Sequence, residues 1–222
     1  VVDPRTGEII KGNVLLGSLR VRQDYMIATG LLAPFSEQSE SEGVLENLAD
    51  SPMMDMALAR IRQLSAHEVG HTLGIYHNFA SSANNRASVM DYPHPKVDII
   101  DGELNLDDAY DTAIGAWDKV TIAYGYQDFP DNVDEIKALN ELLEQAHSSG
   151  LDYISDNDAR PKGGAHPTAH LWDYGQDPTD QLSHILEVRE IALTQFGMAN
   201  LPSGRPTSYL EDVLVPIYFF HR

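Results

Sequence analysis

The stretch that decides the fold is residues 67–79, which read HEVGHTLGIYHNF. It holds three histidines, His67, His71 and His77, at spacings of four and then six residues. At about 100° per residue, His67 and His71 lie on one face of a helix, whereas six further residues would turn His77 about 120° away from that face. The pattern therefore predicts a helix that stops between His71 and His77.

Gly74 stands where that stop is needed. Glycine accepts the left-handed conformation that ends helices and turns the chain. A chain that turns back at Gly74 brings His77 to the point at which His67 and His71 already aim. Three imidazoles that converge and leave a fourth position open are the ligand set of a catalytic zinc ion. The sequence thus predicts a Zn²⁺ site at His67, His71 and His77.

A structural zinc site is the alternative. Such sites are usually closed by four protein ligands and are often rich in cysteine. The chain has no cysteine, and its sequence offers no obvious fourth ligand. The open, catalytic type of site is therefore favoured.

Composition narrows the function classes. The 222 residues are enough for one large domain or two lobes. The net charge of −19 argues against nucleic-acid binding, which needs a basic face. No apolar run approaches the roughly 20 residues of a membrane-spanning helix, so no transmembrane segment is expected. The chain has no initiator methionine and ends in an apolar stretch, which favours part of a longer protein whose targeting signal lies elsewhere.

The order of predicted elements indicates the α+β class, with strands early and helices late. Turn residues at 3–7 between β-branched flanks predict a hairpin in residues 1–18, and the polar stretch 33–43 predicts a loop. Ser51 and Pro52 are typical of a helix start, and the helix is expected to run to Gly74 with Met54, Leu58 and Ile61 as its buried stripe. Other helices are expected at 17–32, 109–126, 131–148, 179–197 and from 207 to the end, where Pro216 would break or kink the last one.

A second motif, SVMDY, begins eleven residues after His77 and covers residues 88–92. Read alone, Met90 is a core methionine. Together with the longer histidine motif, SVMDY resembles the metzincin zinc peptidases. The resemblance implies that Met90 belongs to a methionine turn, an apolar cushion beneath the three histidines, and that Gly74 ends the active-site helix.

The phrases DPRTGEI, HNF and DKVTIAYGY narrow the resemblance to the Met-zincin family of large bacterial zinc-dependent metalloproteases. It implies a metzincin-like fold with a small N-terminal sheet lobe. Residues 1–93 would hold the zinc-binding helix and the methionine turn, and residues 94–222 would form a mostly helical lobe. Related proteins are longer and exported, so the resemblance also implies further domains and an extracytoplasmic location, whether periplasmic, outer-membrane-associated or secreted.

Two departures limit what transfers from metzincins. Only 66 residues precede His67, fewer than the longer N-terminal sheet of many metzincins needs. Asn78 stands where better-known subfamilies carry Asp, Glu, Ser or Pro. Subfamily rules for substrate choice therefore do not apply to this chain.

The implied reaction is hydrolysis of peptide bonds in a peptide or protein substrate. Zinc would activate water, and Glu68 would act as general base and then as proton donor to the leaving amine. A solvent-facing helix residue is the alternative for Glu68. Tyr92, two residues after Met90, resembles a metzincin tyrosine that stabilises the oxyanion, or else is packed behind the turn. A non-catalytic zinc-containing binding module, or an inactive excised domain, is the alternative function.

A calcium site is a further hypothesis. The irregular, acidic segment 155–178 contains four aspartates, Asp156, Asp158, Asp173 and Asp177. Their oxygens are the ligands that Ca²⁺ prefers, although aspartates also form turns without any ion.

Overall fold

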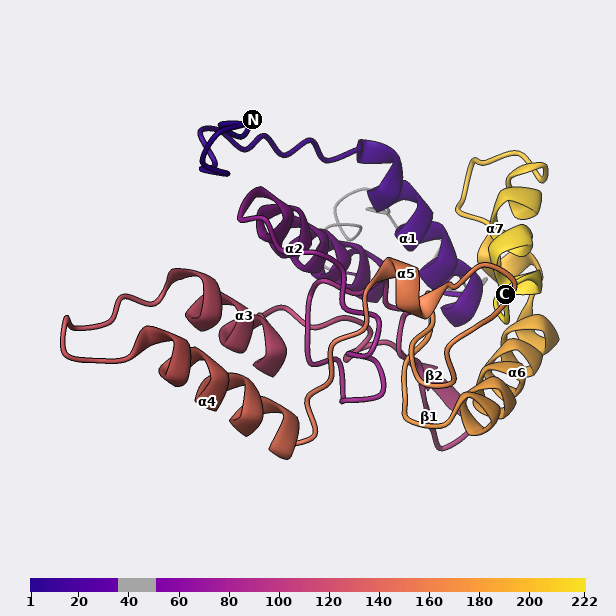
Figure 1. Cartoon of the computed structure of the whole chain (residues 1–222). Helices are drawn as coiled ribbons and strands as arrows, with labels where there is room; N and C mark the ends of the chain where they lie inside the picture. The colour runs from indigo at the N-terminus through magenta and orange to yellow at the C-terminus, as the bar shows by residue number, and fades with distance from the viewer. Residues whose placement is uncertain (36–50) are drawn as a thin grey trace. The chain divides into compact units, whose positions relative to one another are not determined.

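The computed structural model describes residues 1–35 and 51–222 of the chain (Figure 1). The loop predicted at 33–43 therefore lies mostly outside the described residues. The chain gathers into two compact units, each assembled from three stretches. Unit 1 comprises 1–15, 63–94 and 113–178, and unit 2 comprises 16–62, 95–112 and 179–222. The lobes 1–93 and 94–222 stay a prediction.

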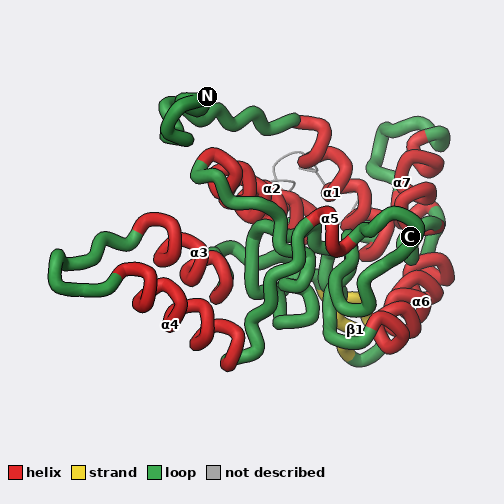
Figure 2. Tube along the Cα trace, viewed as in Figure 1, coloured by secondary structure: helices red, strands yellow, loops and turns green. Residues whose placement is uncertain are grey.

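Unit 1 contains the C-terminal part of α2 (Pro52–Thr72) and three further helices. Helices α3 (Ala116–Tyr126) and α4 (Glu135–Ser148) pack against each other, and α5 (Asp156–Ala159) is a single short turn. Long irregular segments join these helices, as Figure 2 shows. The helices predicted at 109–126 and 131–148 are confirmed with later starts.

Unit 2 contains α1 (Ser18–Leu32), the start of α2, α6 (Pro178–Gln195), the 3-10 turn η1 (Met198–Asn200) and α7 (Tyr209–Tyr218). Helix α1 packs against α7. A Cβ built on Gly30 would lie 2.2 Å from Cγ1 of Ile217, so glycine is required for this close approach. Pro216 lies inside α7. The helices predicted at 17–32, 179–197 and after 207 are confirmed.

The sheet in the described residues differs from the prediction. The N-terminal turn is closed by one bridge, between Val2 and Ile9. The only paired strands of the described residues are β1 (Asp98–Ile100) and β2 (Glu103–Asn105), which run antiparallel in unit 2. Asp101 and Gly102 both have positive φ, +53° and +85°, as a type I′ hairpin turn requires. The described residues are therefore mostly helical with a small two-stranded sheet, and residues 1–35 contribute no strand to it.

Helix α2 begins as predicted but buries a different face. Ser51 caps it, because its Oγ accepts a hydrogen bond from Met54 N at 3.3 Å. The predicted stripe is wrong, since Leu58 is 40% exposed. The buried residues recur every three or four positions, as one helix face does. They are Met53, Met56, Ala57, Arg60, Gln63, His67 and Gly70. No described helix is both long and apolar enough to cross a bilayer.

Candidate metal centre

Helix α2 ends in a turn of the chain at Gly74. Helix α2 stops at Thr72, and Gly74 adopts φ +82°. Gly74 N donates to His71 O at 3.0 Å and Ile75 N donates to Gly70 O at 3.1 Å. These two bonds form a Schellman motif, in which a left-handed glycine satisfies the last carbonyls of a helix. The chain reverses there, and His77 comes back toward His67 and His71.

The three histidines converge within unit 1. One possible ligand atom from each lies within 4.8 Å of the others, and among the described residues this is the only such group of three or more His, Asp or Glu. His71 Nε2 and His77 Nε2 are 3.2 Å apart. Two nitrogens bound tetrahedrally to one zinc, at 2.0–2.1 Å each, stand about 3.3 Å apart. The spacing therefore fits a shared zinc ion.

The other ring nitrogen of each histidine is already bonded to oxygen. The Nδ1 atoms of His67 and His71 lie 2.7 and 2.9 Å from the carbonyl oxygens of Val89 and Ile75. A carbonyl only accepts, so each Nδ1 carries the proton and each Nε2 presents a lone pair. The Nε2 atoms of His71 and His77, 3.2 Å apart, are close enough to share a metal ion. The donor set thus fits a metal.

Burial leaves one side of the triad open. His67 is 2% exposed, the His77 side chain is 16% exposed, and His71 lies at the surface. A closed structural site would need a fourth ligand among the neighbouring carboxylates or imidazoles, and the described residues offer none. The arrangement is that of three protein ligands with access from solvent.

Met90 lies beneath the histidine-bearing helix. Its side chain is 1% exposed, and a Cβ built on Gly70 would lie 2.3 Å from its sulfur. Gly70 sits between the first two histidines, so the absence of a side chain there lets the sulfur rest on the backbone of α2. The backbone of Met90 is also held in place, because Met90 N donates a hydrogen bond to Ser88 Oγ at 3.0 Å. This geometry agrees with a methionine turn.

Asp118, at the start of α3, fixes that turn. Its carboxylate accepts hydrogen bonds from Ser88 Oγ at 2.6 Å, from Val89 N at 2.9 Å and from Gly115 N at 2.6 Å. Val89 O in turn accepts from His67 Nδ1. A buried carboxylate on α3 therefore orients the first histidine through the Val89 peptide. This role of Asp118 was not predicted from the sequence, although the residue begins the phrase DKVTIAYGY.

A family model described as Met-zincin matches residues 49–222. The chain belongs to the Met-zincin family. The resemblance drawn from the motifs is therefore confirmed. No curated protein and no solved structure matches the chain.

In this Met-zincin, Asn78 has a structural role that its place after His77 did not reveal. Asn78 is 1% exposed. Its Nδ2 donates to Asp152 O at 2.9 Å, and its Oδ1 accepts from Ile154 N at 3.1 Å. These bonds tie the third histidine's segment to residues 152–154, which lead directly into α5. An amide supplies both the donor and the acceptor that this junction uses, which a carboxylate cannot do.

Asp156 is the first residue of α5. The bonds between Asn78 and residues 152–154 place it beside His77, the third histidine. Its Oδ2 lies 2.8 Å from His77 Nδ1. Partial burial raises the pKa of Asp156, but the hydrogen bond and charge of His77 outweigh it and hold the pKa below its ordinary value. A carboxylate on the outer nitrogen of a zinc-binding histidine fixes its tautomer and orientation.

The calcium hypothesis gains no support from this arrangement. Asp156 is engaged with His77, and no three carboxylates of the described segment 155–178 come together as ligands.

Asp173 is instead near Asp91, next to the methionine turn. Burial and the charge of Asp173 raise the pKa of Asp91 to about 7, against the opposing hydrogen bond from Ser81 at 2.6 Å.

Tyr92 lies among aromatic rings beside the triad. Its ring stacks on His67 at 5.5 Å between centroids and on Trp172 at 5.3 Å, and the His77 ring is 4.7 Å away. Trp172 N also donates to Tyr92 O at 2.8 Å. A ring held between two others cannot swing away without losing both stacks, so Tyr92 contacts the site from a fixed position.

The carboxylate of Asp156 supplies a testable prediction. We expect Asp156→Asn to lower zinc affinity about 10- to 100-fold, the usual effect of losing an outer partner of a zinc ligand. Titration against a chromophoric chelator measures this affinity. Asp158→Asn is the matched control, because Asp158 is exposed on the same short helix and its side chain makes no bond to another described residue. Equal affinities in the two variants would remove Asp156 from the metal site.

Proposed function

We propose that this chain is a zinc-dependent endopeptidase that hydrolyses peptide bonds in a peptide or protein substrate. The observation that carries the proposal is the convergence of His71 and His77, whose Nε2 atoms are 3.2 Å apart while both Nδ1 atoms are bonded to oxygen. Membership in the Met-zincin family supports a metallopeptidase. The exposure of His71 supports access by an external polypeptide.

Zinc bound at the three histidines would lower the pKa of a bound water molecule to about 7 and polarise the scissile carbonyl. The chain's own residues supply the remaining steps. The rings of His67, His71 and His77 are held in place by oxygen acceptors, so the site is organised before substrate arrives.

Glu68 is the proposed proton carrier. It follows His67 on α2, is partly buried, and its side chain makes no hydrogen bond or ion pair with another described residue. A carboxylate that has no hydrogen-bond or ion-pair partner can accept the proton of the attacking water. It then returns that proton to the leaving amine, so the peptide bond breaks without an acyl-enzyme.

Tyr92 is the proposed donor to the oxyanion. Its ring contacts His67 and His77, which supports a place for its hydroxyl near the reacting carbonyl. Losing one such donor typically costs about 10²- to 10³-fold in rate. Because the stack with Trp172 holds the ring, the hydroxyl would act without a swinging motion.

We expect Tyr92→Phe to keep its zinc and its folding while turnover falls about 100-fold with little change in KM. Phenylalanine preserves the stacking, so the variant removes the hydroxyl alone. Steady-state kinetics on a fluorescence-quenched peptide and a denaturant titration measure the two effects. Near-normal turnover with a stability loss of about 1 kcal/mol would instead identify a packing tyrosine.

The direct test of the function is a digest of casein and of a peptide library by the zinc-loaded chain. We expect internal cleavage that a chelator stops and that stoichiometric zinc restores. A chain that binds zinc at the triad and cleaves neither substrate would be a non-catalytic zinc-containing module.

We further propose that the protein acts outside the cytoplasm, in the periplasm, at the outer membrane or as a secreted enzyme, as part of a longer bacterial protein. The resemblance to exported relatives supports this location. Immunodetection in cell fractions tests it, and a purely cytoplasmic signal would contradict it.

A further inference from the structure

Unit 2 contains a cavity of about 710 Å³. It lies between α1, the start of α2 and the segment that leads into α7. Its lining residues are Ser18, Val21, Arg22, Tyr25, Met26, Met54, Pro202, Ser203, Arg205 and Tyr209. All of them belong to unit 2, whereas the three histidines belong to unit 1.

The lining is mostly apolar. Val21, Met26, Met54 and Pro202 contribute hydrocarbon and thioether surface, and methionine side chains adapt to the shape of a flexible ligand. Small-molecule sites usually measure about 300–1,000 Å³ and combine apolar walls with a few polar groups. The cavity has the size and the walls of such a site.

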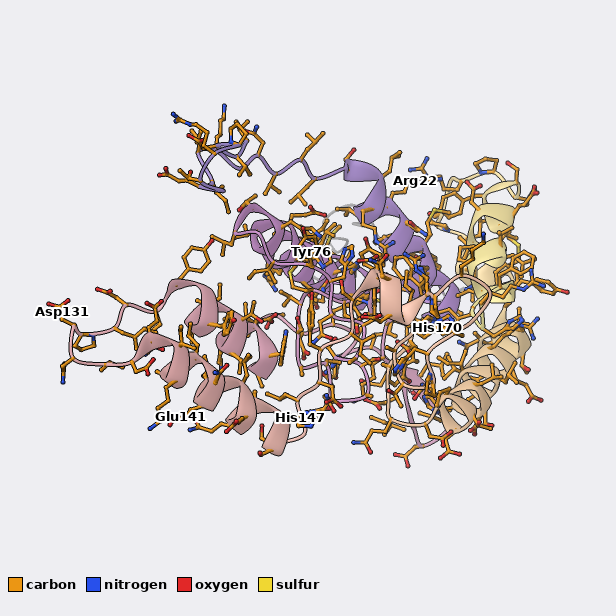
Figure 3. All side chains as sticks on the ribbon, in the orientation of Figure 1. Arg22, Tyr76, Asp131, Glu141, His147 and His170 are labelled. Atoms are coloured by element: carbon orange, nitrogen blue, oxygen red, sulfur yellow. The ribbon has the colours of Figure 1, made fainter. Side chains whose placement is uncertain are left out.

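The charge of the lining is opposite to that of the chain. The protein carries a net charge of −19, yet no lining residue is acidic and two are arginines. Arg22, labelled on α1 in Figure 3, forms an ion pair with Asp212 at 3.0 Å. The Arg205 guanidinium forms no ion pair with any described residue. The cavity therefore offers one uncompensated positive charge.

We propose that this cavity binds a fatty acid, with the apolar chain against Met26 and Met54 and the carboxylate on Arg205. A monoanion matches the single uncompensated positive charge, and a guanidinium binds a carboxylate through two parallel hydrogen bonds. An unbranched hydrocarbon chain matches walls that carry flexible thioethers. The proposal does not depend on the peptidase function, because no lining residue belongs to the metal centre.

The test is a titration of the full chain with 11-(dansylamino)undecanoic acid, followed by competition with laurate and with dodecanol below their aggregation limits. We expect saturable one-site binding that laurate reverses. Dodecanol should compete about 10- to 100-fold less well, because it lacks the charge-assisted bond to Arg205. Equal competition by the two compounds, or binding that never saturates, would overturn the proposal.

Two arginine variants locate the headgroup. We expect Arg205→Gln to weaken laurate about 10- to 100-fold and to leave dodecanol unchanged. Arg62→Gln is the matched control, since Arg62 is an exposed arginine of unit 2 that does not line the cavity. Circular dichroism checks the folding of each variant, and equal laurate affinity in the two arginine variants would overturn the assignment.

Discussion

Glu68→Gln should hold zinc at the parent occupancy and hydrolyse peptides about 10²- to 10⁴-fold more slowly, the range that a positioned general base contributes. Glutamine has nearly the same shape as glutamate but cannot accept the proton of the attacking water at neutral pH. The side chain of Glu68 makes no bond to another described residue, so the substitution breaks no contact that holds the fold. Elemental analysis and initial rates on a quenched peptide measure the two quantities.

The control for this variant must separate a lost base from a lost charge. Glu187→Gln changes the net charge by the same amount at an exposed position of α6 without a partner among the described residues. We expect that variant to retain the parent rate. Hydrolysis by Glu68→Gln at the parent rate, after purification free of contaminating protease, would mean that Glu68 is not the base.

The part of the site that could be predicted from the sequence is the part that depends on local geometry. The spacing of His67 and His71 fixes their common face, and Gly74 has the left-handed φ that turns His77 back. Each of these features is decided within about two turns of one helix. Family resemblance then supplied Met90, whose packing on Gly70 agrees with the turn that it implied.

The supporting residues could not be predicted because they come from distant segments. Asp156 is 79 positions from His77, and Asp118 is 29 positions from Val89. No periodicity links such positions, since each meets its partner only when the chain has folded. Asn78 shows the same limit, because its amide bonds residues 152–154, more than 70 positions away.

The buried face of α2 was misread for a related reason. Its inner side carries Arg60, Gln63 and His67, which are polar and would be assigned to the surface by hydrophobic periodicity. Each has a partner inside the fold, such as Val89 O for both Gln63 and His67. A functional helix that buries polar ligands therefore breaks the pattern by which helices are recognised.

The small β1–β2 hairpin was not predicted from the sequence, because its acidic residues obscured the turn signal of Asp101 and Gly102.

The removal of His71 should have the largest effect on the metal. Its Nε2 lies 3.2 Å from that of His77, and alanine there would leave two imidazoles, one of them buried, to hold the ion. Losing an outer partner of a ligand already costs about 10- to 100-fold in affinity, so losing the ligand itself should cost more than about 100-fold. His147→Ala is the control, because His147 is an exposed histidine bonded to Asp152 and lies outside the triad.

Thermal unfolding of His71→Ala with and without zinc separates an effect on metal binding from an effect on folding. His71 is at the surface, and its Nδ1 bond to Ile75 O is the main contact that alanine removes, so the metal-free variant should unfold close to the metal-free parent. A ligand that binds only the folded state stabilises it by about 2.7 kcal/mol at 100 times Kd. The zinc concentration that stabilises the parent by that amount should lie at or below the Kd of the variant. The same concentration should therefore stabilise the variant by less than about 0.5 kcal/mol. An equal zinc-induced shift in both proteins, with full zinc occupancy of the variant, would remove His71 from the ligand set and with it the three-histidine site.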